Sequence, residues 1–73
     1  GPLEAQVDIV NTKSGPNRFV YRFEWFDERG NRIRNQMTTW KPATVTSRGS
    51  MTISSVGPTE AATDFKLEVQ RGS

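Results

Sequence analysis

Apolar and polar residues alternate along most of this 73-residue chain. The alternation begins at residues 3–9, is strongest at residues 19–25, and returns at residues 51–55 and 65–69. A repeat of two residues is typical of a β-strand that buries one face and exposes the other. The four segments therefore predict strands, and the aromatic residues of 19–25 predict that this strand lies at the centre of a sheet.

Turn residues separate the predicted strands. Clusters rich in glycine, proline, asparagine and serine occupy residues 11–17, 27–31, 48–50 and 57–58. Two further short strands are expected at residues 32–34 and 44–46, the second at a sheet edge because Pro42 cannot donate a hydrogen bond to a central ladder. Five or six short strands joined by such turns predict an all-β fold, either an antiparallel sandwich or a small barrel.

A single helical turn is expected between the last two strands. Thr59 is suited to cap the amino end of a turn at residues 60–62, because its hydroxyl can accept a hydrogen bond from a free backbone N–H. Residues 37–40 are expected to continue irregularly from the strand at 32–34.

The apolar faces of the strands predict one shared core, and the sequence also suggests how the strands pair. We expect the first two strands to form a hairpin, and their core faces match only if paired residue numbers sum to an even value. A sum of 30 places Val7 opposite Phe23 and Asp8 opposite Arg22, which are favourable cross-strand pairs. The residues expected in the core are Val7, Ile9, Tyr21, Phe23, Trp25, Ile53, Phe65 and Leu67.

The length of the chain limits it to one small domain. Hydrophobic residues make up 33% of the sequence, so the core is small and contacts with a partner could add to stability. Gly1–Pro2 resembles the residue pair that a protease cleavage leaves behind, and the domain is therefore expected at residues 3–73. We expect the chain to be an expressed fragment from which an upstream signal or anchor was removed.

Residues that carry catalysis or bind metals are scarce. The chain has no cysteine and no histidine, which excludes thiol chemistry, cysteine-based zinc sites and the commonest general base. It also lacks a glycine-rich phosphate loop. We therefore expect no enzymatic activity, no cofactor and no metal ion. The carboxylates at residues 4, 8, 24, 60, 64 and 68 fall on outward strand positions or in turns, where a solvated face is expected.

Two features leave nucleic-acid binding open as an alternative function. The aromatic row at residues 19–25 could stack nucleobases on an exposed platform, although its expected role is to form the core. Arg29, Arg32 and Arg34 crowd one hairpin and could contact phosphates, although a charged edge that prevents aggregation is the simpler explanation. The net charge of +2 is too small to favour a nucleic-acid partner strongly.

The segment Trp40-Lys41-Pro42 is the most distinctive local feature. A tryptophan beside a proline either closes one end of the core or presents a recognition surface. We expect the first role for Trp40, and we keep it with Arg29, Arg32 and Arg34 as a candidate interaction residue.

The order of these signals resembles the YcfL-like family of bacterial envelope lipoproteins. The most specific motif is Tyr-Arg-Phe-x-Trp-Phe-Asp-x-x-Gly at residues 21–30, followed by Trp-x-Pro at residues 40–42. The further matching segments are residues 7–14, Val56-Gly57-Pro58, Ala61-Ala62 and Phe65. The resemblance covers nearly the whole chain, but the signal and the lipidated cysteine of such a precursor are absent from it.

The resemblance implies an antiparallel immunoglobulin-like β-sandwich of five to seven short strands. It also implies a periplasmic location, with a lipid anchor outside this chain holding the full-length protein at the outer membrane. The expected function is contact with a protein partner in the cell envelope. Separately from the resemblance, the short segments after Arg34 leave a strand edge open, and a homodimer through such an edge is a further expectation. The family supplies no catalytic residue that could be transferred to this sequence.

Overall fold

The computed structural model describes residues 2–34 and 39–72, and within these residues it contains β-strands and no helix. The predicted all-β fold is confirmed. Residues 2–34 and 39–72 therefore also contain no helix with the length and apolar composition that a membrane crossing requires. The strands are β1 (Glu4–Val10), β2 (Asn17–Phe26), β3 (Arg32–Ile33), β4 (Lys41–Val45), β5 (Ser50–Val56) and β6 (Asp64–Arg71).

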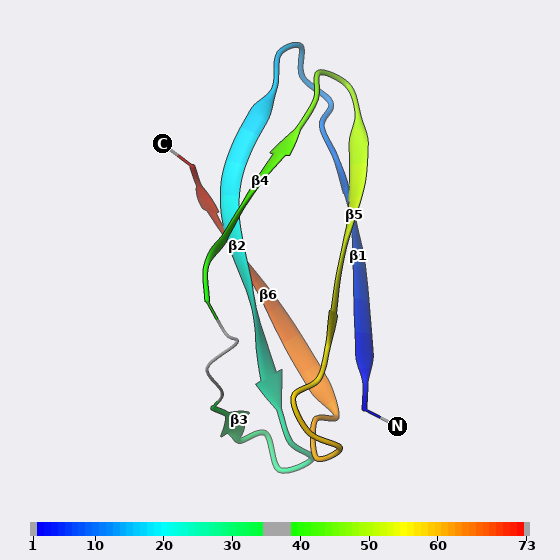
Figure 1. Ribbon diagram of the computed structural model, residues 1–73, viewed down its shortest axis with the longest axis vertical. Coiled ribbons are helices and arrows are strands. Elements are labelled where there is room, and N and C mark those ends of the chain that lie inside the picture. The colour runs from blue at the N-terminus through cyan, green and yellow to red at the C-terminus, as the bar shows by residue number, and fades with distance from the viewer. Residues whose placement is uncertain (1, 35–38, 73) are drawn as a thin grey trace.

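The strands form two antiparallel sheets that pack face to face as an open sandwich. β1 pairs with β5 in a two-stranded sheet, and β2 is the centre of a four-stranded sheet. One edge of β2 pairs with β6, and the other edge pairs with β3 and then β4. Figure 1 shows β1 and β5 side by side, facing the layer of β2, β4 and β6. The slab measures 41 × 22 × 16 Å.

The predicted hairpin between the first two strands is wrong. The connection at residues 11–16 carries the chain from one sheet to the other, so β1 and β2 face each other across the core instead of sharing hydrogen bonds. β1 pairs with β5, with Val7 opposite Ile53, and β2 pairs with β6, with Phe23 opposite Leu67. In each of these pairs the residue numbers sum to an even value, as matching core faces require.

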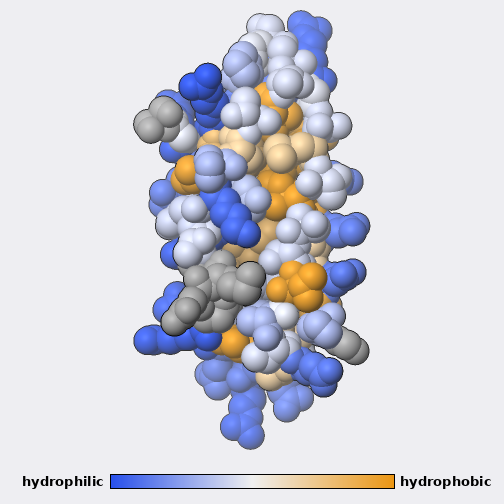
Figure 2. Space-filling view, viewed as in Figure 1, coloured by the Kyte–Doolittle hydropathy of each residue, from blue (hydrophilic) through white to orange (hydrophobic). Residues whose placement is uncertain are grey.

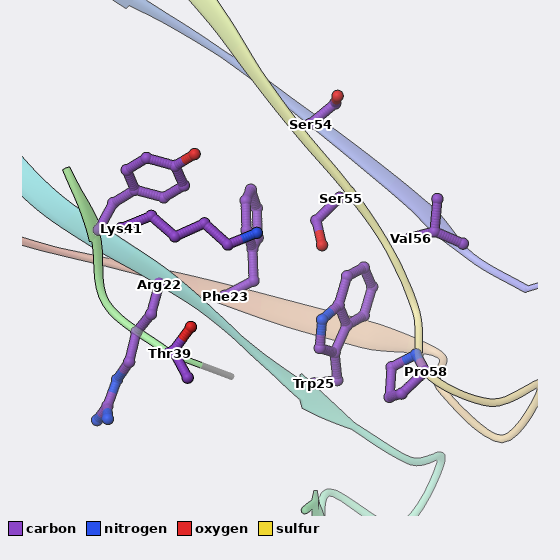
Figure 3. A pocket seen from close by; sticks show the side chains of 10 residues that line it. Arg22, Phe23, Trp25, Thr39, Lys41, Ser54, Ser55, Val56 and Pro58 are labelled. Atoms are coloured by element: carbon purple, nitrogen blue, oxygen red, sulfur yellow. The ribbon is translucent and has the colours of Figure 1, made fainter. Parts of the chain in front are cut away.

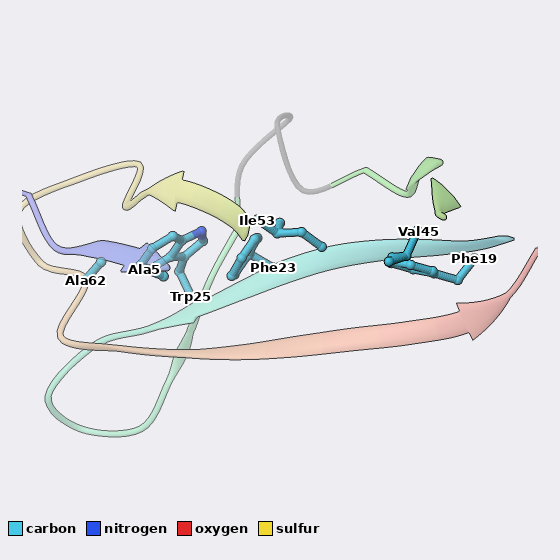
Figure 4. Close-up of a cluster of buried hydrophobic side chains, with 7 residues drawn as sticks. All are labelled: Ala5, Phe19, Phe23, Trp25, Val45, Ile53 and Ala62. Carbon is cyan, nitrogen blue, oxygen red and sulfur yellow. The ribbon is translucent and has the colours of Figure 1, made fainter. Parts of the chain in front are cut away.

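The core lies between the sheets and consists mainly of odd-numbered strand residues, with Ala62 added from the link between β5 and β6. Phe23 and Trp25 rise from β2 toward the other sheet, where they meet Ala5 of β1 and Ile53 of β5 (Figure 4). Their rings are stacked with centroids 6.1 Å apart, and Phe65 of β6 lies beside both rings. All eight residues expected in the core belong to this cluster, either buried or packed against it.

Asn11 ties the two sheets together at one end of the sandwich. Its side chain is buried, and its amide Nδ2 donates to the carbonyl oxygens of Gly15, Val45 and Thr46 at 2.9, 3.3 and 3.1 Å. Its Oδ1 accepts a hydrogen bond from the backbone N–H of Lys13. The links between β1 and β2 and between β4 and β5 are thereby joined, which fixes the separation of the sheets at this end.

The expected turns are present. Asp27 Oδ1 accepts hydrogen bonds from the backbone N–H groups of Arg29 and Asn31, and Gly30 adopts a φ of 81° that other residues rarely take. The Thr59 hydroxyl accepts a hydrogen bond from Ala61 N at 3.2 Å, but the segment forms a hydrogen-bonded turn instead of a helical turn. Gly1 of the expected cleavage remnant, and residues 37 and 38 of the irregular segment, lie outside the described residues.

Candidate functional site

A chain of ion pairs crosses the outer face of the four-stranded sheet. Arg22 of β2 contacts Glu24 of the same strand at 3.2 Å and Glu68 of β6 at 3.0 Å. Arg32 of β3 contacts the second oxygen of Glu24 at 3.3 Å. The even-numbered positions of three strands meet here because β2 pairs with β3 on one edge and with β6 on the other. We call these four residues the Arg22 network.

Trp40 lies on this same outer face. The guanidinium carbon of Arg22 is 4.7 Å from the centroid of the Trp40 ring, which is a cation–π contact. Trp40 is partly exposed and is not a member of the core cluster. The expectation that Trp40 closes one end of the core is therefore wrong. Its position just before the first residue of β4 places the ring beside the network, on the side of the sheet that faces away from β1 and β5.

Glu24 was expected on a solvated face, and the structure corrects that expectation. Its side chain is only 11% exposed, because Arg22 and Arg32 enclose its carboxylate. A carboxylate with little access to water needs such partners, since burying an unpaired charge is costly. The ion pairs of the Arg22 network therefore fix the positions of its four side chains on the outer face of the sheet.

The three arginines that were expected to cluster do not share one environment. Arg32 is neutralised by Glu24, and Arg29 lies exposed in the turn between β2 and β3, beside Asp27 and Glu28. Arg34 is exposed after the end of β3. The four rings at residues 19–25 point into the sandwich, so they do not form an exposed platform for bases.

Sequence reasoning missed the central role of Arg22, because the incorrect hairpin paired it with Asp8. The charges of β2 and β6 carry a signal in the sequence that indicates this role of Arg22. If β2 and β6 are paired with a sum of 90, Arg22 lies opposite Glu68 and Glu24 lies opposite Lys66, which are two pairs of opposite charge. The same alignment sets Phe23 against Leu67 and Trp25 against Phe65 on the inner face.

The sandwich has an opening on each side, because the sheets share no strand. On the side of β4 and β5, a cavity of about 50 Å³ lies between Trp25, Ser55 and Lys41. Figure 3 shows Lys41 extending along its mouth and Arg22 pointing away from it. Figure 2 shows apolar side chains visible between the sheets on this side. A cavity of this size has room for water but not for an organic ligand.

On the side of β1 and β6, the opening is a wider groove of about 430 Å³. Its apolar part consists of Ile9 from β1, Phe19 from β2, and Leu67 and Val69 from β6. Val69 is 51% exposed, which is unusual for a valine on the inner face of a sheet. The polar residues of the groove are Lys13, Asn17, Arg18, Gln70 and Arg71.

Both openings are lined by apolar, neutral polar and cationic side chains, without a carboxylate among the described residues that line them. Residues 2–34 and 39–72 contain no group of three or more histidine, cysteine, aspartate or glutamate side chains that could hold a metal ion. Among these residues, every fully buried side-chain nitrogen or oxygen has a hydrogen-bond partner, so none is left aimed at a missing ligand. The surfaces with distinctive chemistry are thus the outer face at Trp40 and the groove between β1 and β6.

Comparison with known proteins identifies the fold and the family of this chain. A crystal structure of a DUF1425 family member from Shewanella sp. pv-4 superimposes with a TM-score of 0.93 at 23% identity, and covers 100% of this chain and 68% of that chain. The crystal structure of Campylobacter jejuni cj0090 has a TM-score of 0.76 at 14% identity, with 94% of this chain and 73% of that chain covered. No curated protein matches the chain. Residues 1–71 match the model of the family described as "Protein of unknown function (DUF1425)", and the chain therefore belongs to the DUF1425 family.

Proposed function

We propose that this chain is the periplasm-facing domain of a bacterial outer-membrane lipoprotein of the YcfL-like kind, and that it acts without catalysis by binding a protein of the cell envelope. The envelope location rests on the sequence resemblance, whose most specific motif spans residues 21–30 and residues 40–42. In the structure this motif forms most of β2, the turn at Gly30 and the segment that carries Trp40. The motif thus includes both partners of the Trp40–Arg22 contact.

The observation that carries the binding role is the partly exposed indole of Trp40 on the guanidinium of Arg22. Tryptophan and arginine are the residue types that contribute most often to hot spots in protein interfaces. Glu24 and Glu68 hold Arg22 from two sides, so the pair is already ordered before a partner arrives. Binding therefore costs less conformational entropy of the Arg22 side chain than it would if this arginine were mobile.

The envelope location is tested on the full-length gene product. We expect a signal peptide that ends in a small residue followed by cysteine, upstream of the residue that is Leu3 here. Cells that express it and are fed labelled palmitate should yield a labelled protein in the outer-membrane fraction, and a variant without that cysteine should lose the label. A product that begins in the cytosol without a signal would contradict the location.

The binding role is tested by replacing Trp40 with a photo-crosslinking amino acid in cells. We expect a discrete adduct with one envelope protein, and none when the crosslinker replaces Gln6, an exposed residue of β1 in the other sheet. The partner identified by mass spectrometry should bind the purified domain, and Trp40→Ala should weaken that binding at least about tenfold. Equal crosslinking from both positions would contradict a surface at Trp40.

The same purified domain distinguishes protein binding from the nucleic-acid alternative. We expect a labelled oligonucleotide to show no change in fluorescence anisotropy at about 150 mM salt, where nonspecific contacts are already weak. Binding that falls steeply with salt, and that disappears when Arg29, Arg32 and Arg34 are replaced with alanine, would instead support the alternative.

A further inference from the structure

The outer edge of β6 is a strand edge without a partner among the described residues. β6 pairs with β2 on one side only, and it is the longest of the edge strands, with eight residues. Gly72 N donates to Arg18 O across this pair, so the even-numbered residues of β6 direct their backbone groups toward β2. The N–H and C=O groups of Leu67 and Val69 therefore point to the free edge, as does the C=O of Phe65, whereas the N–H of Phe65 donates to Asp64 Oδ1 at 2.8 Å.

This edge lacks two common protections against strand pairing. It contains neither proline nor glycine between residues 64 and 71, and Val69 leaves an apolar side chain half exposed along it. A long regular edge with exposed apolar residues is a template for another strand. Lys66 is the one positive charge in its middle, and among the described residues no carboxylate lies within ion-pair distance of it.

The charges of β6 are complementary to themselves when two copies run antiparallel. If Leu67 faces Leu67 of the second copy, Lys66 faces Glu68 of the second copy, and Phe65 faces Val69 of the second copy. By symmetry each of the last two pairs occurs twice. Asp64 faces Gln70 of the second copy, so no like charges meet at the ends of the pairing.

Neighbouring registers are less favourable because they bring like charges together. Moving the centre of the pairing to Lys66, which slides the strands by two residues, sets Lys66 against Lys66 and Asp64 against Glu68. Moving the centre to Glu68 sets Glu68 against Glu68. Like charges directly opposite each other destabilise a strand pair. In all three registers odd-numbered residues face odd-numbered residues, as their outward backbone groups require, so the charges decide between the registers.

We propose that two copies of this chain associate through β6, antiparallel and centred on Leu67, so that the two four-stranded sheets become one continuous sheet. The pairing covers the half-exposed Val69 and the apolar part of the groove between β1 and β6. This inference stands apart from the proposed envelope function, because a protein monomeric in solution could still bind its envelope partner through Trp40.

Charge reversal tests the pairing and its register together. Sedimentation velocity over a concentration series should show a reversible dimer for the wild type. Lys66→Glu and Glu68→Lys should each weaken the dimer on the order of tenfold, because each introduces two like-charge pairs across the dyad. An equimolar mixture of the two variants should restore it, since every facing pair is then of opposite charge. Lys41→Glu on β4 is the matched control and should leave the dimer unchanged.

Disulfide crosslinking tests the same register without altering the ion pairs. The chain has no cysteine, so Leu67→Cys carries a single thiol. Two such residues facing each other across the dyad have Cα atoms about 5.5 Å apart, which a disulfide can span. Val69→Cys is the control on the same strand, because this register separates the two thiols by roughly 13 Å although the side chain is more exposed.

We expect mild oxidation to link Leu67→Cys into a dimer and to leave Val69→Cys largely monomeric. A wild-type protein that stays monomeric up to about 1 mM overturns the proposal. So does faster linking of Val69→Cys, or a dimer that neither charge reversal weakens. Glu68→Lys also removes a partner of Arg22, and its folding is therefore checked by thermal denaturation. If it does not fold, Lys66→Glu and the cysteine pair decide the question.

Discussion

The edge of the four-stranded sheet at β4 is five residues long and contains Pro42, whereas the edge at β6 is eight residues long and contains no proline. The opening beside β4 is a cavity of about 50 Å³, and the one beside β6 is a groove of about 430 Å³. The central strand β2 is thus flanked on one side by a short strand that contains a proline, and on the other by a long strand that contains none. The difference indicates that the sequence protects only one edge against pairing with another strand.

Removing the indole of Trp25 should cause the largest loss of stability, because this ring contacts residues on both sides of the sandwich. It is 3% exposed, lines the cavity beside β4 and packs against Phe65 of β6. We expect Trp25→Ala to lower the free energy of unfolding by about 3–5 kcal/mol, measured by urea denaturation. Trp40→Ala is the control and should cost about 1 kcal/mol or less. Equal losses for both would contradict the separation of core and outer face.

The next largest effect is expected at Asn11, which holds β1 and β4 at one end of the sandwich. Asn11→Ala leaves the carbonyl groups of Val45 and Thr46 without this donor in a poorly hydrated place. We expect a loss of about 2–3 kcal/mol of unfolding free energy. Asn17→Ala removes the same side chain from an exposed position and should change stability by less than about 0.5 kcal/mol. A loss of similar size in both variants would show that Asn11 is not a specific link.

A smaller loss of stability is expected from replacing Glu24, whose carboxylate connects Arg32 of β3 to Arg22 of β2. Glu24→Gln keeps the size of the side chain but removes the charge that both arginines contact. We expect a loss of about 1–2 kcal/mol, which should shrink in high salt. Glu28→Gln in the exposed turn is the control and should be neutral within about 0.5 kcal/mol. If Glu24→Gln leaves the free energy of unfolding unchanged, the Arg22 network orders these side chains but does not stabilise the fold.

The smallest effect on stability is expected from replacing two valines of nearly equal exposure. These two replacements should nevertheless differ clearly in their effect on self-association. Val69 of β6 is 51% exposed and Val56 of β5 is 52% exposed. Replacing either with serine should change the free energy of unfolding by less than about 0.5 kcal/mol. Only Val69→Ser should reduce self-association in sedimentation experiments. A matching decrease with Val56→Ser would place the association on the wrong side of the sandwich.

The strands and the buried face were predictable from the sequence, because alternation reports directly which side chains leave the water. Phe23 and Trp25 illustrate this, since their spacing alone placed them in the core. The pairing of strands was not predicted. Alternation is the same for a hairpin and for an arch between sheets, and only long-range charge matching, as between Arg22 and Glu68, distinguishes the two.

The outer face was the least predictable part of the molecule. Trp40 was recognised as distinctive, but an aromatic ring beside a proline is compatible with either face of a sheet. Its position depends on Arg22, whose own partners Glu24 and Glu68 come from two strands. The surface formed by Trp40 and Arg22 therefore depends on how the strands pair, and it could not be predicted without knowing that pairing.

The pairing of β1 with β5 has a consequence for the time course of folding. More than half of the chain lies between Val10 and its partner Ser50, so β1 waits for most of the domain to be synthesised before it can pair. β2 likewise gains β6 only when residues 64–71 have been synthesised. Folding that depends on such distant contacts is slow, because the entropy of closing a long loop must be overcome first. The nascent domain therefore remains open to chaperones and proteases until its final strand has been delivered.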